Sequence, residues 1–104
     1  MDYDLVQFHF AIPVPLSITP NSMRYLNDIP HPHFRIGLYA WNNKYILKIE
    51  AGLFEQTYKI SEIDVLDPSE LPNMVDETFL KQVARRFVDM GADWQATAER
   101  HELD

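Results

Sequence analysis

A two-residue asparagine turn constrains the fold of this chain more than any other feature of its sequence. Asn42-Asn43 separates two runs rich in β-branched and aromatic residues, and asparagine tolerates the positive φ that two-residue hairpin turns require. Such a turn fixes the register, so we expect the cross-strand pairs Trp41–Lys44, Tyr39–Ile46, Leu38–Leu47, Ile36–Ile49 and Arg35–Glu50. One face of the hairpin is then apolar and consists of Ile36, Leu38, Ala40, Tyr45, Leu47 and Ile49.

A second turn, around Gly52, extends this hairpin into a three-stranded antiparallel meander that ends near Ile60. Two registers keep the same residues on each face. Pairing Ile49 with Phe54 places Lys48 opposite Glu55, whereas a shift by two residues places Glu50 opposite Glu55. Cross-strand charge favours the first register. We expect Phe54, Tyr58 and Ile60 to join the apolar face.

The segment before the meander predicts two further elements. Tyr3–Ile12 alternates aromatic and branched residues in the manner of a strand with two apolar faces. Five prolines follow before His33, and within this stretch Thr19-Pro20 is a suitable start for a short helix over Asn21–Asp28. This strand is either covered on both sides or lies at an interface, and its position in the sheet stays open.

The C-terminal part predicts a helical cover for the apolar face. Asp67-Pro68-Ser69-Glu70 begins a helix of one or two turns before Pro72. From Asp76 an apolar stripe follows at helical spacing, and it is made of Phe79, Val83, Phe87, Met90 and Trp94. Gly91 either lies within this helix or ends it before a second one. The sequence therefore predicts one α+β domain over residues 1–104, an antiparallel meander of three to four strands with one face covered by a C-terminal amphipathic helix.

Composition excludes several classes of site. The chain has 104 residues, no cysteine and three glycines, so it has no thiolate nucleophile, no cysteine-based metal site and no glycine-rich phosphate loop. No motif for a cofactor is present, and we expect none. No stretch is apolar enough to span a membrane, and Asp2 and Asp4 stand where a signal peptide is basic. We therefore expect a cytoplasmic protein without a membrane partner.

Few residues combine into a pattern that could carry catalysis or bind a metal. His31 and His33 flank Pro32, but imidazoles two residues apart in an extended segment point to opposite sides unless a turn intervenes. They are weak candidates for a metal or small-molecule site. The carboxylates fall at helix starts and on polar faces, where capping and solubility explain them. Whether the chain is an enzyme stays open, with a non-enzymatic role favoured.

The outer face of the meander, opposite its apolar face, is the most informative surface. Four of the nine basic residues fall there beside aromatic and branched side chains, and the candidate binding residues are Arg35, Tyr39, Trp41, Lys44, Ile46 and Lys48. This surface could be covered by the chain's own N-terminal half, by a partner protein or second copy, or by a ligand. Exposed aromatic rings between cations could also stack on bases.

The distribution of charge along the chain favours some of these possible occupants over others. Residues 61–104 hold eleven acids and four bases, which account for the whole formal charge of −7, whereas residues 1–60 are neutral. Nucleic-acid binding is therefore disfavoured. We expect a small interaction or regulatory domain that acts through Tyr39, Trp41 and Ile46 or through the acidic C-terminal helix, as a homodimer or with another protein. The alternatives are a small-molecule or metal site near His31 and His33 and, last, single-stranded nucleic acid on the sheet face.

Overall fold

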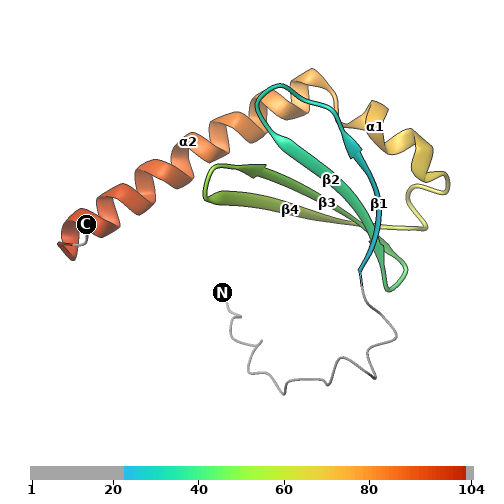
Figure 1. Ribbon diagram of the computed structural model, residues 1–104, viewed down its shortest axis with the longest axis horizontal. Helices are drawn as coiled ribbons and strands as arrows, with labels where there is room; N and C mark the ends of the chain where they lie inside the picture. The colour runs from blue at the N-terminus through green and yellow to red at the C-terminus, as the bar shows by residue number, and fades with distance from the viewer. Residues whose placement is uncertain (1–22, 103–104) are drawn as a thin grey trace, which may run out of the picture.

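The computed structural model describes residues 23–102, and the predicted strand Tyr3–Ile12 lies outside this range. One antiparallel sheet has the strand order β1-β2-β3-β4 (Figure 1). Its strands are β1 (Arg24–Ile29), β2 (Arg35–Trp41), β3 (Lys44–Ala51) and β4 (Phe54–Ser61). A 3₁₀ turn, η3 (Pro68–Glu70), then leads into α1 (Leu71–Met74) and the long helix α2 (Glu77–Arg100). The predicted α+β class with an antiparallel meander is confirmed.

The β2–β3 hairpin has the register that the asparagine turn predicts. Trp41 pairs with Lys44, Tyr39 with Ile46 and Arg35 with Glu50. Asn42 has a φ of 54° and Asn43 a φ of 64°, so both turn residues adopt the left-handed conformation of a type I′ turn. The turn chemistry alone was enough to assign every pair in this hairpin.

The predicted register of the β3–β4 hairpin is wrong by two residues. Ile49 pairs with Gln56, and Glu50 lies opposite Glu55. The observed loop is only two residues long, with Gly52 at a φ of 61° in its first position, as a type II′ turn requires. A tight turn therefore outweighs the repulsion of one carboxylate pair on the outer face, which costs only about 0.2–1 kcal/mol. Because the shift is even, every residue keeps its expected face.

The predicted helix over Asn21–Asp28 is also wrong where it can be compared, because residues 24–29 form β1. This strand pairs with β2 and contains a β-bulge between Tyr25 and Asn27. Two forces favour the strand: Pro30 disfavours the helical conformation of Ile29, and β2 offers a full row of backbone groups for pairing. Leu26 and Ile29 then pack against the core.

The core lies between the apolar face of the sheet and the helical cover, and its buried members are Ile36, Leu38, Tyr45, Leu47, Ile49, Val65, Leu71 and Val83. Helix α2 begins at its N-cap Asp76, whose Oδ1 accepts a 2.9 Å hydrogen bond from the Phe79 backbone N–H. Val83 is 0% exposed. The ring of Phe79 contacts Tyr58 edge-on at 5.2 Å between centroids.

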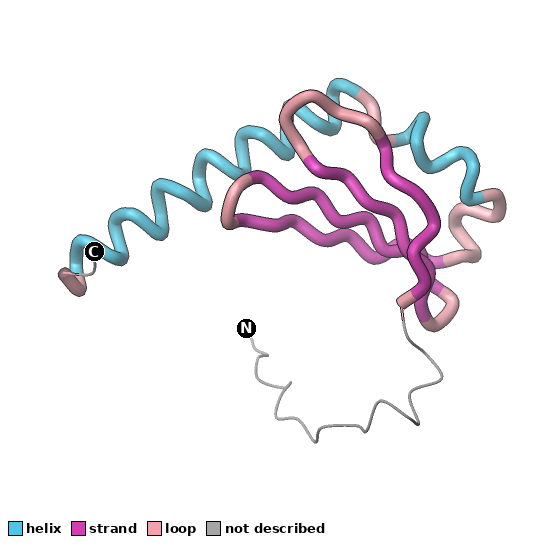
Figure 2. Tube along the Cα trace, in the orientation of Figure 1, coloured by secondary structure: helices cyan, strands magenta, loops and turns pink. Residues whose placement is uncertain are grey.

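Helix α2 runs without interruption through Gly91, so the alternative of two helices is wrong. Its first half covers the sheet, and its C-terminal end extends past the strands (Figure 2). Trp94, at that end, is 57% exposed, although the apolar stripe predicted that it would pack on the sheet. No helix within residues 23–102 combines the length and apolar character that crossing a membrane requires.

Candidate functional site

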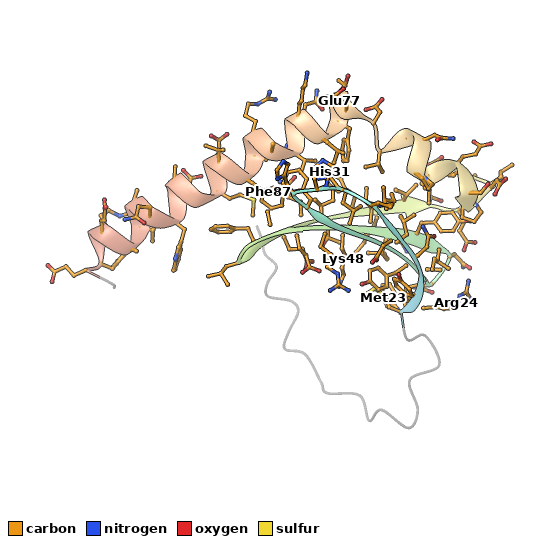
Figure 3. The ribbon with its side chains drawn as sticks, turned by 45° about the horizontal axis from the view of Figure 1, so that its top comes forward. Met23, Arg24, His31, Lys48, Glu77 and Phe87 are labelled. Atoms are coloured by element: carbon orange, nitrogen blue, oxygen red, sulfur yellow. The ribbon has the colours of Figure 1, made fainter. Side chains whose placement is uncertain are left out.

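The outer face of the sheet brings most of the predicted binding residues together. Tyr39 and Trp41 on β2 pair directly with Ile46 and Lys44 on β3, and Ile46 pairs in turn with Lys59 on β4. Figure 3 shows Lys48 and Met23 on the side of the sheet that faces away from α2. Register, rather than proximity in sequence, therefore assembles this surface.

Two lysine ammonium groups on this face lie over aromatic rings. The Lys48 Nζ atom is 5.4 Å from the centroid of the Tyr39 ring, and the Lys59 Nζ atom is 6.0 Å from the centroid of the Trp41 ring. Each such contact contributes about 0.5–1 kcal/mol at a solvated site. The contacts hold both cations close to the aromatic side chains, where an anionic group would meet them.

Gly37 determines the position of the Tyr39 ring. A Cβ atom at residue 37 would lie 3.1 Å from the Tyr39 Cε1 atom, which means that the tyrosine ring lies back over the glycine. The Tyr25 ring meets Tyr39 edge-on at 5.7 Å between centroids. Partial desolvation, followed by the neighbouring Asp28 carboxylate, raises the pKa of Tyr25 above its ordinary value. The Tyr25 phenol therefore keeps its proton at neutral pH.

An open cavity of about 290 Å³ lies beside these rings and is lined by Met23, Trp41, Ile46, Lys48, Thr57 and Lys59. Ile46 is only 2% exposed, so it forms the floor of the cavity. It is buried, and the expectation that it is an exposed contact residue needs this correction. The cavity therefore combines an apolar floor, an indole wall and two ammonium groups.

Arg35, in contrast, lies at the other end of the outer face and does not line the cavity. It pairs with Glu50, which lies opposite Glu55. The Glu55 Oε2 atom accepts a 2.5 Å hydrogen bond from the Thr57 hydroxyl. The outer face thus has an aromatic and cationic end at Trp41 and a mixed, more acidic end at Arg35. Lys44, half-buried beside Trp41, belongs to the first end.

The histidine loop between β1 and β2 contains a tight turn. The His31 Nδ1 atom accepts hydrogen bonds from the backbone N–H groups of His33 (3.0 Å) and Phe34 (3.1 Å). An accepting Nδ1 places the proton of the neutral ring on Nε2. The His31 ring also stacks on Phe34 at 4.9 Å between centroids. His31 is thus committed to local structure.

A second open cavity, of about 450 Å³, lies at this loop and is lined by His31, His33, Phe34, Glu77, Leu80, Lys81 and Ala84. It lies against the start of α2, on the opposite side of the sheet from the outer-face cavity (Figure 3). Within residues 23–102, no three histidine or carboxylate side chains are close enough together to hold a metal ion. The weak metal candidates His31 and His33 therefore lack a third protein ligand in the described part of the chain.

Gln56 is a buried polar residue that sequence reasoning did not single out. It is 9% exposed, and its Nε2 atom donates a 2.9 Å hydrogen bond to the backbone carbonyl of Val83 in α2. Its Oε1 atom accepts a 2.9 Å hydrogen bond from the Tyr58 hydroxyl. The sequence does contain a signal for this role, because Gln56 is a polar residue on a strand face that is otherwise apolar. Its role is to attach the helix to the sheet.

Comparison of the chain with protein-family models, curated proteins and solved structures finds no match in any of the three. Any functional assignment therefore depends on the geometry of the sites described above.

Proposed function

We propose that this chain is a small, non-enzymatic protein-interaction module that binds an acidic partner segment through the outer face of its sheet. The observation that supports the proposal is the outer-face cavity, which places an apolar floor at Ile46 and a wall at Trp41 beside the ammonium groups of Lys48 and Lys59. Aromatic anchors with neighbouring charges are typical of protein interfaces.

The size and shape of the cavity favour a protein side chain over a free small molecule. Its volume of about 290 Å³ lies at the lower limit of the roughly 300–1,000 Å³ that is typical of small-molecule sites. An apolar side chain could enter it while its backbone lies across the strands. Carboxylates on either side of that side chain would then meet Lys48 and Lys59.

The distribution of charge disfavours nucleic acid on the same surface. Asp28, Glu50 and Glu55 lie on the outer face together with its cations. A single strand carries one phosphate per nucleotide and would meet these carboxylates as it continued along the sheet. A protein segment can place its few acids at the cationic end alone.

Fluorescence anisotropy with a defined probe tests the proposal. The probe is a labelled twelve-residue peptide of alternating aspartate and leucine, compared with a lysine–leucine peptide and with a single-stranded oligothymidine of twelve nucleotides. We expect the acidic peptide to bind and the basic one not to bind. Lys48→Glu and Lys59→Glu should each weaken binding about tenfold, because they replace attraction by repulsion.

Arg85→Glu is the matched control, since Arg85 is exposed on α2 and lines neither the outer-face cavity nor the histidine-loop cavity. Equal binding of the acidic and basic peptides, or equal losses in the control and test variants, would contradict the proposal. Tighter binding of oligothymidine would favour the nucleic-acid alternative. Light scattering at several concentrations shows whether the partner is a second copy, since a homodimer doubles the mass of 12.2 kDa.

A second candidate is small-molecule binding at the histidine-loop cavity, which its larger volume of about 450 Å³ favours. The His31 Nε2–H group and the Lys81 ammonium group would supply donors, and the stacked ring of Phe34 an apolar contact. We expect no tight, stoichiometric binding of Zn²⁺, Ni²⁺ or Mn²⁺ in equilibrium dialysis, because His31 Nδ1 already accepts two hydrogen bonds. Stoichiometric binding of one of these metals would restore the metal-site alternative. A cytoplasmic location remains a prediction from the sequence.

A further inference from the structure

We propose that residues 2–12 dock on the outer face of their own molecule and compete there with the partner segment. This inference rests on the proposed function, because it assumes that the outer face is a docking surface. It assigns to the N-terminal segment the role of an intramolecular occupant. The argument depends on where the chain enters the described structure, on the charge of the segment and on the position of the other acidic segment.

The chain enters the described structure at the rim of the outer-face cavity. Met23, the first described residue, lines this cavity together with Trp41 and Lys59. Figure 3 shows Met23 and Lys48 on the same side of the sheet. Residues 13–22 connect the segment to this point, and ten residues span at most about 33–36 Å. Three strand spacings of about 4.8 Å cover the width of the sheet, so the whole outer face is within reach.

The composition of the segment matches the chemistry of the surface. Residues 1–22 contain Asp2 and Asp4 and no lysine or arginine. The apolar residues of the segment follow directly and include Tyr3, Leu5, Val6, Phe8, Phe10 and Ile12. Carboxylates next to apolar side chains are what the cavity between Trp41 and Lys48 favours. The segment therefore has the same recognition features as the proposed partner.

The acids of helix α2 are held away from this surface in the same molecule. Helix α2 packs against the core face through Val83, which is 0% exposed, and through the hydrogen bond from Gln56. Its acids are held on the opposite side of the sheet. The N-terminal segment, in contrast, joins the described structure at Met23, on the rim of the outer-face cavity.

Docking within one molecule would regulate partner binding. A segment tethered by a short connection has an effective concentration on the order of millimolar, so a partner must displace it. The apparent affinity for the partner then falls in proportion to the fraction of molecules whose face is uncovered. The N-terminal segment would thus act as an autoinhibitory element.

Trp41 supplies the reporter for the test. The chain has two tryptophans, and Trp94 is 57% exposed at the end of α2, so Trp94→Phe leaves Trp41 as the single fluorophore. In this background, the test variant is Asp2→Lys/Asp4→Lys and the control is Glu99→Lys/Glu102→Lys. Both pairs raise the net charge by four, but in the control pair Glu99 lies in the last turn of α2 and Glu102 follows the end of the helix.

Acrylamide quenching of Trp41 and anisotropy with the aspartate–leucine peptide give two independent readouts. We expect the test variant to raise the quenching constant at least twofold and to bind the peptide about tenfold more tightly, while the control variant changes neither. Thermal unfolding followed by circular dichroism verifies that all variants fold.

The outcomes separate this inference from the proposed function. Equal quenching in the test and control variants would overturn the inference, even if the peptide binds. Failure of the peptide to bind any variant would overturn the proposed function, whatever the quenching shows. If simple dilution of the Trp94→Phe chain exposes Trp41, the face is covered by a second copy, and the intramolecular form of the inference is wrong.

Discussion

Removal of the Gln56 side chain is expected to loosen the attachment of α2 to the sheet. In Gln56→Ala, the 2.9 Å hydrogen bonds to the Val83 carbonyl and from the Tyr58 hydroxyl are both lost. Each contributes about 0.5–1.5 kcal/mol net. The Val83 carbonyl retains its bond within the helix, and Tyr58 Oη still accepts from Arg86 Nη1 at 3.4 Å. With the space left in the core, we expect a total loss of about 2–3 kcal/mol in the free energy of unfolding.

Two further substitutions at Gln56 separate volume from hydrogen bonding. Gln56→Leu restores most of the volume, so its loss should be about 1 kcal/mol. Gln56→Glu should be the most damaging at pH 7, because it places a carboxylate 9% exposed against the carbonyl oxygen of Val83. When protonated, the same carboxyl group can donate to Val83 and accept from Tyr58, as the native amide does.

The pH dependence of Gln56→Glu follows from this difference. The fold favours the neutral form, so the pKa of the introduced carboxyl group is higher in the folded than in the unfolded state, where it is about 4.3. The loss of stability is then absent below about pH 4 and increases as the pH rises above that value. Urea unfolding at pH 4 and pH 7, followed by circular dichroism, measures this loss relative to the native chain.

Thr57→Ala is the control for these variants, since it removes only an exposed hydrogen bond to Glu55. We expect it to change stability by no more than about 0.5 kcal/mol. The explanation fails if Gln56→Ala costs as little as this control. It also fails if Gln56→Glu shows the same loss at both pH values.

Three further predictions follow from the fold. Gly37→Ala should lower the free energy of unfolding by about 1 kcal/mol, because the new Cβ atom would lie 3.1 Å from Tyr39 Cε1. In a Tyr39→Ala background the same change should stabilise the strand. Equal losses of stability in both backgrounds, measured by urea unfolding, would contradict this contact. A backbone hydrogen bond from Ser69 lowers the pKa of Asp67 below its ordinary value, so the stabilisation by this carboxylate is present above about pH 3.8 and is lost as the pH falls through the lower pKa of the folded state. The melting-temperature difference between the native chain and Asp67→Ala should therefore decrease from pH 6 to pH 2.5. A constant difference would show that the Asp67 carboxylate does not cap η3. Val83→Ala should lower the free energy of unfolding by about 2–3 kcal/mol, because Val83 is 0% exposed, whereas Trp94→Ala should lower it by less than about 0.5 kcal/mol. A comparable loss of stability in both variants would show that the C-terminal end of α2 is packed against the rest of the protein.

Sequence reasoning succeeded where a local rule determined the geometry. Asn42-Asn43 specified a type I′ turn, and the turn specified every pair of the β2–β3 hairpin. Helical spacing identified α2, and the acidic residue Asp76 identified its start. These signals depend on residues close together in sequence, so no knowledge of distant contacts was needed.

It failed where distant contacts compete with local rules. Residues 24–29 form a strand because β2 supplies a pairing edge, which no local pattern reveals. In the β3–β4 hairpin, a tight turn at Gly52 outweighs the repulsion of one carboxylate pair, and cross-strand charge alone does not reveal this. The burial of Ile46 and the role of Gln56 both depend on side chains from other strands. Such residues can be recognised only once the sheet is assembled.

Stability and binding can be separated on the two faces of this sheet. The core face depends on Val83, Gln56 and their neighbours, so changes there report on folding. Among the residues that line the outer-face cavity, Ile46 alone is buried. A substitution of Ile46 would therefore change stability and binding at the same time. Trp41 and the lysines line the cavity without belonging to the core. A loss of peptide binding in Trp41→Ala with unchanged unfolding would therefore place binding on the outer face, whereas unfolding of this variant would show that Trp41 is a structural residue.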